Sequence, residues 1–144
     1  MNSKIIFTLI FIAGLAGVIL FGYLQATAPA SNDPNAPKIL ISPESFDFGE
    51  IQYGDIVTHN FGVTNSGKSD LEIKRVATSC GCTTAKISRQ IIKPGESADL
   101  VVEYNTAAMG DLPENHGQQE RIIYVKSNDP ANPQVNAEIS AFVK

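Results

Sequence analysis

The sequence predicts an all-β fold, an antiparallel β-sandwich of about seven strands, preceded by one N-terminal transmembrane helix. The first observation is an alternation of apolar and polar residues with a period of two, in short segments between residues 39 and 144. Turn-forming residues separate these segments at regular spacing, and no segment keeps the 3.6-residue apolar period of a helix. The second observation is an uncharged, mostly apolar stretch at residues 5–24.

Residues 5–24 are long enough to cross a membrane as a helix. At ~1.5 Å per residue they would span about 30 Å, the thickness of the hydrocarbon core of a bilayer. Lys4 and the amino terminus carry the only positive charges on the short N-terminal side. We therefore expect residues 1–4 to stay in the cytoplasm and the rest of this single-pass chain to lie on the periplasmic or extracellular side of the cytoplasmic membrane.

Two alternatives compete with a permanent signal anchor. A cleaved signal peptide would release a secreted domain, but the apolar stretch exceeds the ~7–15 residues of a usual signal core. In addition, Pro29 would directly follow a cut after Ala28. A lipoprotein would need a cysteine where Thr27 stands. The length of the apolar stretch favours the anchor.

A proline-rich linker follows the predicted anchor at residues 25–38. It contains Pro29, Pro34 and Pro37 among Ala, Ser and Asn residues, a composition typical of an extended segment. Residues 39–144 remain for one folded domain, which is long enough to bury its own core.

Each expected strand has an apolar face and a polar face. Leu71 and Ile73 face one side while Glu72 faces the other, and the pattern shifts at residues 74–75, which indicates a β-bulge. The chain has no Trp, and its two cysteines are one residue apart. The predicted sandwich is therefore Ig-like but without the disulfide that joins the sheets of antibody domains. The expected strands include residues 46–48, 58–63, 71–76, 91–92, 98–104, 122–125 and 135–143.

The composition excludes one class of partner. Lys and Arg number 11 against 15 Asp and Glu, so the net charge is −4, whereas proteins that bind a phosphate backbone normally carry a basic stripe. We therefore expect no nucleic-acid partner.

The sequence also has no nucleophile elbow, no Gly-rich phosphate loop and no HExxH motif, and we expect that the protein is not an enzyme.

Four stretches taken together resemble a known family. They are residues 45–51 (SFDFGEI), 61–67 (FGVTNSG), 78–84 (TSCGCTT) and 92–97 (IKPGES). In this order they resemble family 1573 of the bacterial domains of unknown function (DUF). The resemblance implies an exported Ig-like domain, similar to Hydin-type and major-sperm-protein-type modules, and it supplies no established activity. Residues 105–118 form a longer connection than is usual in that family.

Cys80 and Cys82, separated by Gly81, carry the most obvious chemistry in the chain. Three interpretations stay open. The pair could form a strained structural or redox disulfide, a soft-metal site with two thiolates suited to Cu(I) or Zn(II), or two free thiols. Gly81 supplies the backbone freedom that a small disulfide ring or a shared metal would need.

The expected topology places two further metal ligands near the cysteines. When strands alternate in direction, the loops after the first, third and fifth strands share one pole of a sandwich. Cys80 and Cys82 follow the third expected strand, and the 105–118 segment follows the fifth, so Met109 and His116 should lie at the same pole. These four side chains would suit Cu(I), which makes copper the expected cofactor if a metal is bound. The linker enters at the opposite pole, so the cysteines should face away from the membrane.

These observations favour a non-catalytic, membrane-tethered module of the cell envelope that binds a protein partner or scaffolds an assembly. Antiparallel sandwiches expose edge strands, to which a partner can add a strand. The alternative is a soft-metal or thiol–disulfide function centred on Cys80 and Cys82. The expected partners are the membrane, through the N-terminal helix, and a protein.

Overall fold

The computed structural model of the chain describes residues 33–144. The predicted cytoplasmic end at 1–4, the predicted anchor at 5–24 and most of the predicted linker at 25–38 lie outside the described residues. Among the described residues, no helix is long and apolar enough to cross a membrane.

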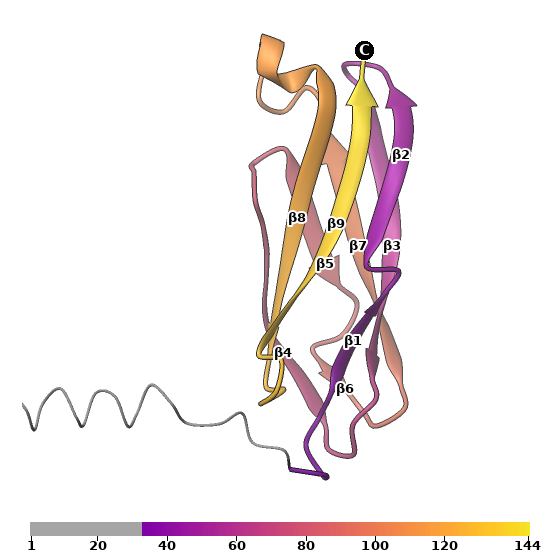
Figure 1. Ribbon diagram of the computed structural model, residues 1–144, viewed down its shortest axis with the longest axis vertical. Coiled ribbons are helices and arrows are strands. Elements are labelled where there is room, and N and C mark those ends of the chain that lie inside the picture. The colour runs from indigo at the N-terminus through magenta and orange to yellow at the C-terminus, as the bar shows by residue number, and fades with distance from the viewer. Residues whose placement is uncertain (1–32) are drawn as a thin grey trace, which may run out of the picture. The chain divides into compact units, whose positions relative to one another are not determined.

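Strands dominate the described part of the chain, and they form two sheets (Figure 1). A four-stranded sheet has the order β1-β3-β7-β5, and a five-stranded sheet has the order β2-β9-β8-β4-β6. The all-β prediction is confirmed. In chain order the elements are β1 (Ile39–Ser42), β2 (Ser45–Ile51), β3 (Ile56–Asn65), β4 (Leu71–Thr78), β5 (Thr83–Ile87), β6 (Ile91–Ile92), β7 (Ser97–Asn105), the 3-10 helix η1 (Pro113–Asn115), β8 (Gly117–Ser127) and β9 (Gln134–Val143).

The strand count and one pairing differ from the prediction. Residues 33–144 contain nine strands rather than about seven, because the short strands β1 and β5 were not expected. The sandwich is also not purely antiparallel, because β2 runs parallel to β9. The reason lies at Pro43, which has no N–H to continue the β1–β3 ladder. The chain leaves the four-stranded sheet there and continues in the same direction beside the C-terminal strand of the other sheet (Figure 1).

The predicted bulge in β4 is confirmed. The register of β4 against β8 shifts between Ile73 and Arg75. The extra residue lets the strand keep Leu71 and Ile73 buried at one end while Val76 packs against the core at the other.

The core lies between the facing sides of the two sheets and follows the predicted alternation. Along β7, buried residues at 98, 100, 102 and 104 alternate with exposed or half-buried ones. Burial of these apolar side chains is the main force that holds the sheets together. The largest fully buried side chains include Phe61, Leu71, Ile92, Leu100, Ile123 and Ile139.

The loops gather at two poles of the sandwich (Figure 1). The N-terminal pole contains residues 33–38 and the loops at 66–70, 93–96 and 128–133. The cysteine pole contains the turns at 52–55 and 79–82, the long loop at 106–116 and the C-terminus.

Asn65, the last residue of β3, is fully buried at the N-terminal pole and makes four hydrogen bonds. Its Oδ1 accepts from the backbone N–H groups of Lys38 (3.3 Å) and Gly67 (2.9 Å). Its Nδ2 donates to the carbonyl oxygens of Ser69 (2.8 Å) and Ile92 (2.9 Å). One amide therefore connects the segment before β1, the β3–β4 loop and β6, which belong to different sheets.

The β3–β4 loop, which begins with the Asn65-Ser66-Gly67 turn, needs glycine at position 67. A Cβ atom there would lie 2.3 Å from the carbonyl oxygen of Ala36 and 2.5 Å from the nitrogen of Lys38. Real Cβ atoms do not approach backbone so closely, so the Asn65-Ser66-Gly67 turn is fixed both by the Asn65 amide and by this close packing.

Replacing the Asn65 amide should destabilise the domain strongly. Asn65→Ala removes four hydrogen bonds to the backbone, one buried and three partly buried, and we expect the free energy of unfolding to fall by about 3 kcal/mol. Asn65→Asp should cost at least as much, because a carboxylate oxygen would face two carbonyl oxygens. Urea unfolding of the full chain in detergent micelles, followed by Tyr fluorescence, measures both losses.

Asn60→Ala is the matched control, because Asn60 is exposed on the outer side of the same strand. It should change the free energy of unfolding by less than about 0.5 kcal/mol. An Asn65→Ala variant as stable as this control would contradict the assigned role of the amide.

Candidate functional site

The cysteine pole is built around the turn that connects β4 of the five-stranded sheet to β5 of the four-stranded sheet. Cys80 and Cys82 form a disulfide within this turn, and the described residues contain no free cysteine. The Thr78 hydroxyl reaches the carbonyl oxygens of Cys80 (3.0 Å) and Thr83 (2.9 Å), which holds the two ends of the turn together. Of the three interpretations left open by the sequence, the structure contains the disulfide.

The two sulfur atoms have different surroundings. Cys82 is only 5% exposed and belongs to the hydrophobic core, whereas Cys80 is half-buried and packs against the edge of that core. The Thr83 hydroxyl oxygen lies 3.4 Å from the Cys80 sulfur and 3.8 Å from the Cys82 sulfur. A molecule that approaches the disulfide from solvent therefore meets Cys80 first.

Arg121 of β8 reaches the disulfide from the opposite sheet. Its Nε donates a hydrogen bond to the Sγ of Cys82 over 3.0 Å. Its Nη2 donates to Oε1 of Gln119 (2.5 Å) and its Nη1 donates to the carbonyl oxygen of Glu120 (2.7 Å). The guanidinium is thus held by neutral groups and by sulfur, and none of the ion pairs within residues 33–144 includes it.

The ring of Tyr104, in β7, packs against this guanidinium. The Arg121 carbon Cζ lies 5.5 Å from the centre of the Tyr104 ring, within the range of a cation–π contact. Burial raises the pKa of the Tyr104 hydroxyl above its ordinary value, and the positive charge of Arg121 opposes this only in part. The phenol therefore stays neutral and adds no negative charge beside the arginine.

Met109 lies against the cysteine turn. A Cβ built on Gly81 would be 3.5 Å from the Met109 sulfur, while the Met109 residue as a whole is 52% exposed. The structure therefore brings Met109, from the 106–116 loop, close to the residue between the two cysteines.

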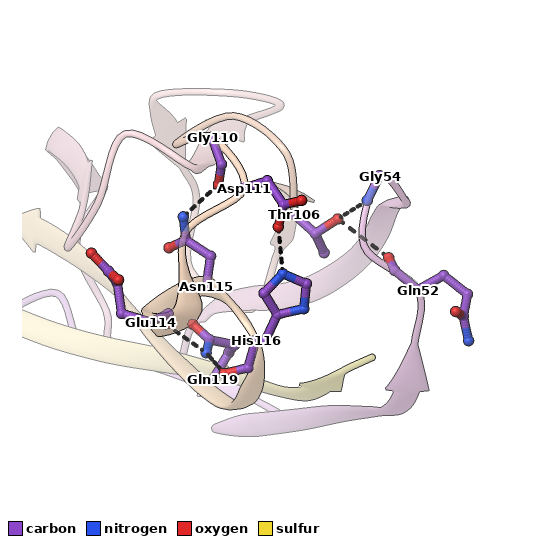
Figure 2. A network of polar contacts seen from close by, with 9 residues as sticks. All are labelled: Gln52, Gly54, Thr106, Gly110, Asp111, Glu114, Asn115, His116 and Gln119. Carbon is purple, nitrogen blue, oxygen red and sulfur yellow. Dashed lines mark hydrogen bonds and ion pairs between the residues drawn. The ribbon is translucent and has the colours of Figure 1, made fainter.

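His116 is engaged elsewhere at the same pole. Its Nε2 is 2.6 Å from Oδ1 of Asp111, a contact that Figure 2 shows. Its ring stacks on Tyr53, with the ring centres 5.2 Å apart. The structure thus pairs His116 with a carboxylate and an aromatic ring of the 52–55 turn.

Hydrogen bonds to the backbone hold the 106–116 loop in shape (Figure 2). The Thr106 hydroxyl oxygen accepts from the N–H of Gly54 over 2.8 Å and lies 3.3 Å from the carbonyl oxygen of Gln52. At the other end, the Gln119 amide donates to the carbonyl oxygens of Glu114 (3.1 Å) and His116 (2.9 Å). Both ends of the loop are therefore tied to neighbouring backbone.

This arrangement offers two kinds of chemistry. As a disulfide with an adjacent guanidinium, it can exchange with thiols. After reduction, two thiolates and the Met109 thioether would be soft ligands. Within residues 33–144 no group of three or more His, Cys, Asp or Glu side chains is placed to hold a metal ion, so a metal would depend on the thioether or on movement of His116.

Sequence reasoning missed Arg121 and its two neighbours in this site, Gln119 and Tyr104. One signal was present in β8, where Arg121 shares the inward-facing phase of Ile123 and Val125. A charged residue in phase with buried aliphatic residues often has a specific partner, but the sequence does not say that the partner is a sulfur atom.

His59 of β3 is a second unusual group, located between the sheets. Its ring stacks on Phe46, with centres 3.7 Å apart, and meets the edge of Phe61. Its Nε2 is buried and has no hydrogen-bond partner. Burial lowers the pKa of His59 below its ordinary value, so this half-buried histidine packs between the two rings as a neutral group.

Comparisons with known proteins agree with the predicted family and fold. The family described as "Protein of unknown function (DUF1573)" matches residues 39–143, which confirms the predicted resemblance. No curated protein matches the chain.

Solved structures of low sequence identity share the fold. A protein of unknown function from Porphyromonas gingivalis W83 has 24% identity and a TM-score of 0.67, and the match covers 81% of this chain and 51% of that one. A PapD-like domain of human CEP192 has 12% identity and a TM-score of 0.56, with 82% and 92% covered. The secreted serine protease VesC from Vibrio cholerae has 19% identity and a TM-score of 0.51, with 76% and 23% covered.

This chain therefore spans about half the length of the Porphyromonas protein and about a quarter of VesC. At these identities the likenesses show the fold alone, an Ig-like and PapD-like β-domain.

The environment of His59 makes a prediction about pH. Because the pKa of His59 is lower in the folded state than in the unfolded state, the unfolded chain binds more protons below about pH 6.5, and the free energy of unfolding should fall as the pH drops. His59→Phe keeps the stack on Phe46 and removes this titration. We expect the variant to lose less stability than the wild type between pH 7 and pH 5 in urea unfolding.

His116→Gln is the control, because it removes the other histidine and leaves His59 in place. Its free energy of unfolding should still show the part of the decrease between pH 7 and pH 5 that comes from His59. Equal pH slopes for the wild type and His59→Phe would show that His59 contributes nothing to the acid sensitivity of the fold.

Proposed function

The chain belongs to the DUF1573 family, and we propose that it is a non-catalytic module that binds a protein partner or scaffolds an assembly in the cell envelope. In this proposal residues 5–24 anchor it in the cytoplasmic membrane, and the linker at 25–38 carries the Ig-like domain on the outer side. The length and charge pattern of the N-terminal stretch support the anchor.

The exposed edge strand β5 carries the proposal of a binding function. It lies at the end of the four-stranded sheet and pairs only with β7. Its five residues keep an unbroken register with Tyr104–Leu100 of β7, so the strand is regular along its whole length. In an edge strand, alternate backbone N–H and C=O groups point away from the only neighbour, where an extended segment of a partner can pair with them.

The other edges are less suited to such pairing. The edge strand β2 has a register shift between Asp47 and Glu50, and the positive φ of 70° at Gly49 bends it there. Bulges and charges of this kind are common devices that protect an edge from pairing. The edges β1 and β6 are only four and two residues long. We therefore assign partner binding to β5.

Site-specific crosslinking tests this assignment. A photo-reactive residue at position 86 of the full chain in intact cells should give one discrete protein adduct, because Lys86 is exposed on β5. The same residue at position 126 is the control, because Lys126 is exposed on β8, inside the five-stranded sheet. Equal adduct yields at both positions, or none at position 86, would refute binding at β5.

The proposed membrane anchor at residues 5–24 leads to a separate prediction. The full chain should stay with the membrane fraction after an alkaline carbonate wash, and mass spectrometry should find residues 1–31 still attached. A soluble product that begins at Pro29 would replace the anchor with a cleaved signal peptide and make the domain secreted.

As a second candidate function we propose Cu(I) binding by the reduced cysteine pole. The closeness of the Met109 sulfur to Gly81 favours it, because a thioether then stands beside two thiolates, and all three are soft ligands. His116 would complete the set only after it leaves Asp111. In the oxidised state the two sulfur atoms are bonded to each other, so this function requires reduction first.

Anaerobic titration of the reduced full chain with Cu(I) tests this candidate. We expect one copper per chain, no uptake after Cys82→Ser, and weaker binding after Met109→Ala. Leu112→Ala is the matched control, because it removes another exposed apolar side chain of the same loop. Binding that is unchanged by Met109→Ala, or that persists after Cys82→Ser, would exclude the proposed ligand set.

A further inference from the structure

We propose that the Cys80–Cys82 disulfide is an exchangeable redox bond that accepts two electrons from a dithiol, and that Arg121 is the positioning residue that holds Cys82 as the leaving thiolate. This inference goes beyond partner binding at β5 and does not rest on it. It rests on the contacts of the disulfide at the cysteine pole.

The first observation is the position of the positive charge. The Arg121 Nε is 3.0 Å from the Cys82 sulfur, and within residues 33–144 no hydrogen bond joins a cation to the Cys80 sulfur. A neutral disulfide sulfur is a weak hydrogen-bond acceptor, whereas a thiolate is a charged one. The guanidinium therefore stabilises the reduced form more than the oxidised form, and it favours Cys82 as the sulfur that carries the negative charge.

The second observation is that this guanidinium has no carboxylate partner among the described ion pairs. It is half-buried, and neutral groups on Gln119 and Glu120 fix its orientation. Because the Arg121 side chain is already held in place and its charge has no acidic partner within residues 33–144, it loses little conformational freedom when the thiolate forms beside it.

The third observation is the difference in access between the two sulfur atoms. Cys80 is half-buried while Cys82 is 5% exposed, so an incoming thiolate reaches Cys80 first. The sulfur atom that is attacked and the sulfur atom that leaves are therefore distinct, and the leaving one is the one held by Arg121. A leaving thiolate of lowered basicity departs faster.

The proposed step is a balanced two-electron exchange. One thiolate of the dithiol attacks the Cys80 sulfur, the Cys80–Cys82 bond breaks, and Cys82 leaves as a thiolate beside Arg121. The second thiol of the dithiol then loses its proton and attacks the dithiol sulfur that is bonded to Cys80. Cys80 is released as a thiolate and takes up that proton. The dithiol is oxidised to a disulfide, and the protein is reduced to the Cys80 thiol and the Cys82 thiolate.

Redox equilibration of the full chain in detergent micelles tests the proposal. The chain is incubated anaerobically with mixtures of reduced and oxidised dithiothreitol, quenched with acid, alkylated and weighed by mass spectrometry. We expect Arg121→Met to need about a tenfold higher ratio of reduced to oxidised reagent for half reduction, and to be reduced more slowly, because it loses a charge-assisted hydrogen bond to the thiolate. Arg121→Lys, which keeps the charge, should recover part of the loss.

Lys126→Met is the matched control, because it removes one positive charge from the exposed side of the same strand and should behave as the wild type. Urea unfolding of each variant shows whether it is folded. If Arg121→Met does not fold, the comparison of Arg121→Lys with the wild type still tests whether the hydrogen bond from the guanidinium to the Cys82 sulfur matters. Identical equilibria and rates for the wild type and the Arg121 variants, or a wild-type disulfide that excess reduced dithiothreitol does not open, would overturn the proposal.

The order of the two sulfur atoms has its own test. The oxidised chain is exposed to reduced glutathione and quenched with acid, and fragment mass spectrometry locates the mixed disulfide. The glutathione should be attached to Cys80. Attachment to Cys82 would contradict attack at Cys80.

Discussion

The buried amide of Asn65 is the interaction on which the arrangement of the sandwich depends. With four hydrogen bonds it joins the segment before β1 and the β3–β4 loop to β6, so it fixes where the first strand begins relative to both sheets. From that start the chain runs up β1, crosses at Pro43, and continues beside β9 in the other sheet.

The two poles are closed by different chemistry. At the N-terminal pole, the Asn65 amide and the buried Asp129 carboxyl group satisfy backbone groups of the strand ends and loops. At the cysteine pole, Arg121 of one sheet donates to the Cys82 sulfur beside the other sheet, so the sandwich is closed by a contact whose strength depends on the redox state of sulfur.

The proposed binding edge and the proposed redox bond are neighbours in the chain, because β5 begins one residue after Cys82. A partner strand that pairs with β5 would therefore lie close to Cys80, the more accessible sulfur. The turn that carries the disulfide also connects the two sheets, so opening of the bond would loosen the start of the edge strand. Binding and exchange are independent proposals, but the topology gives them a shared location.

The sequence by itself determined the all-β class, the bulge at 74–75, the family and the sharing of one pole by the cysteine turn and the 106–116 loop, because alternation and turn residues are local signals. Only the tertiary structure decided the parallel pairing of β2 with β9, which depends on which sheet receives the chain after Pro43. It also decided that His116 turns to Asp111 and that Arg121 meets Cys82 across 39 residues of sequence. The first contact depends on how the 106–116 loop folds on itself, and the second joins segments far apart in the sequence, so no local pattern of residues specifies either of them.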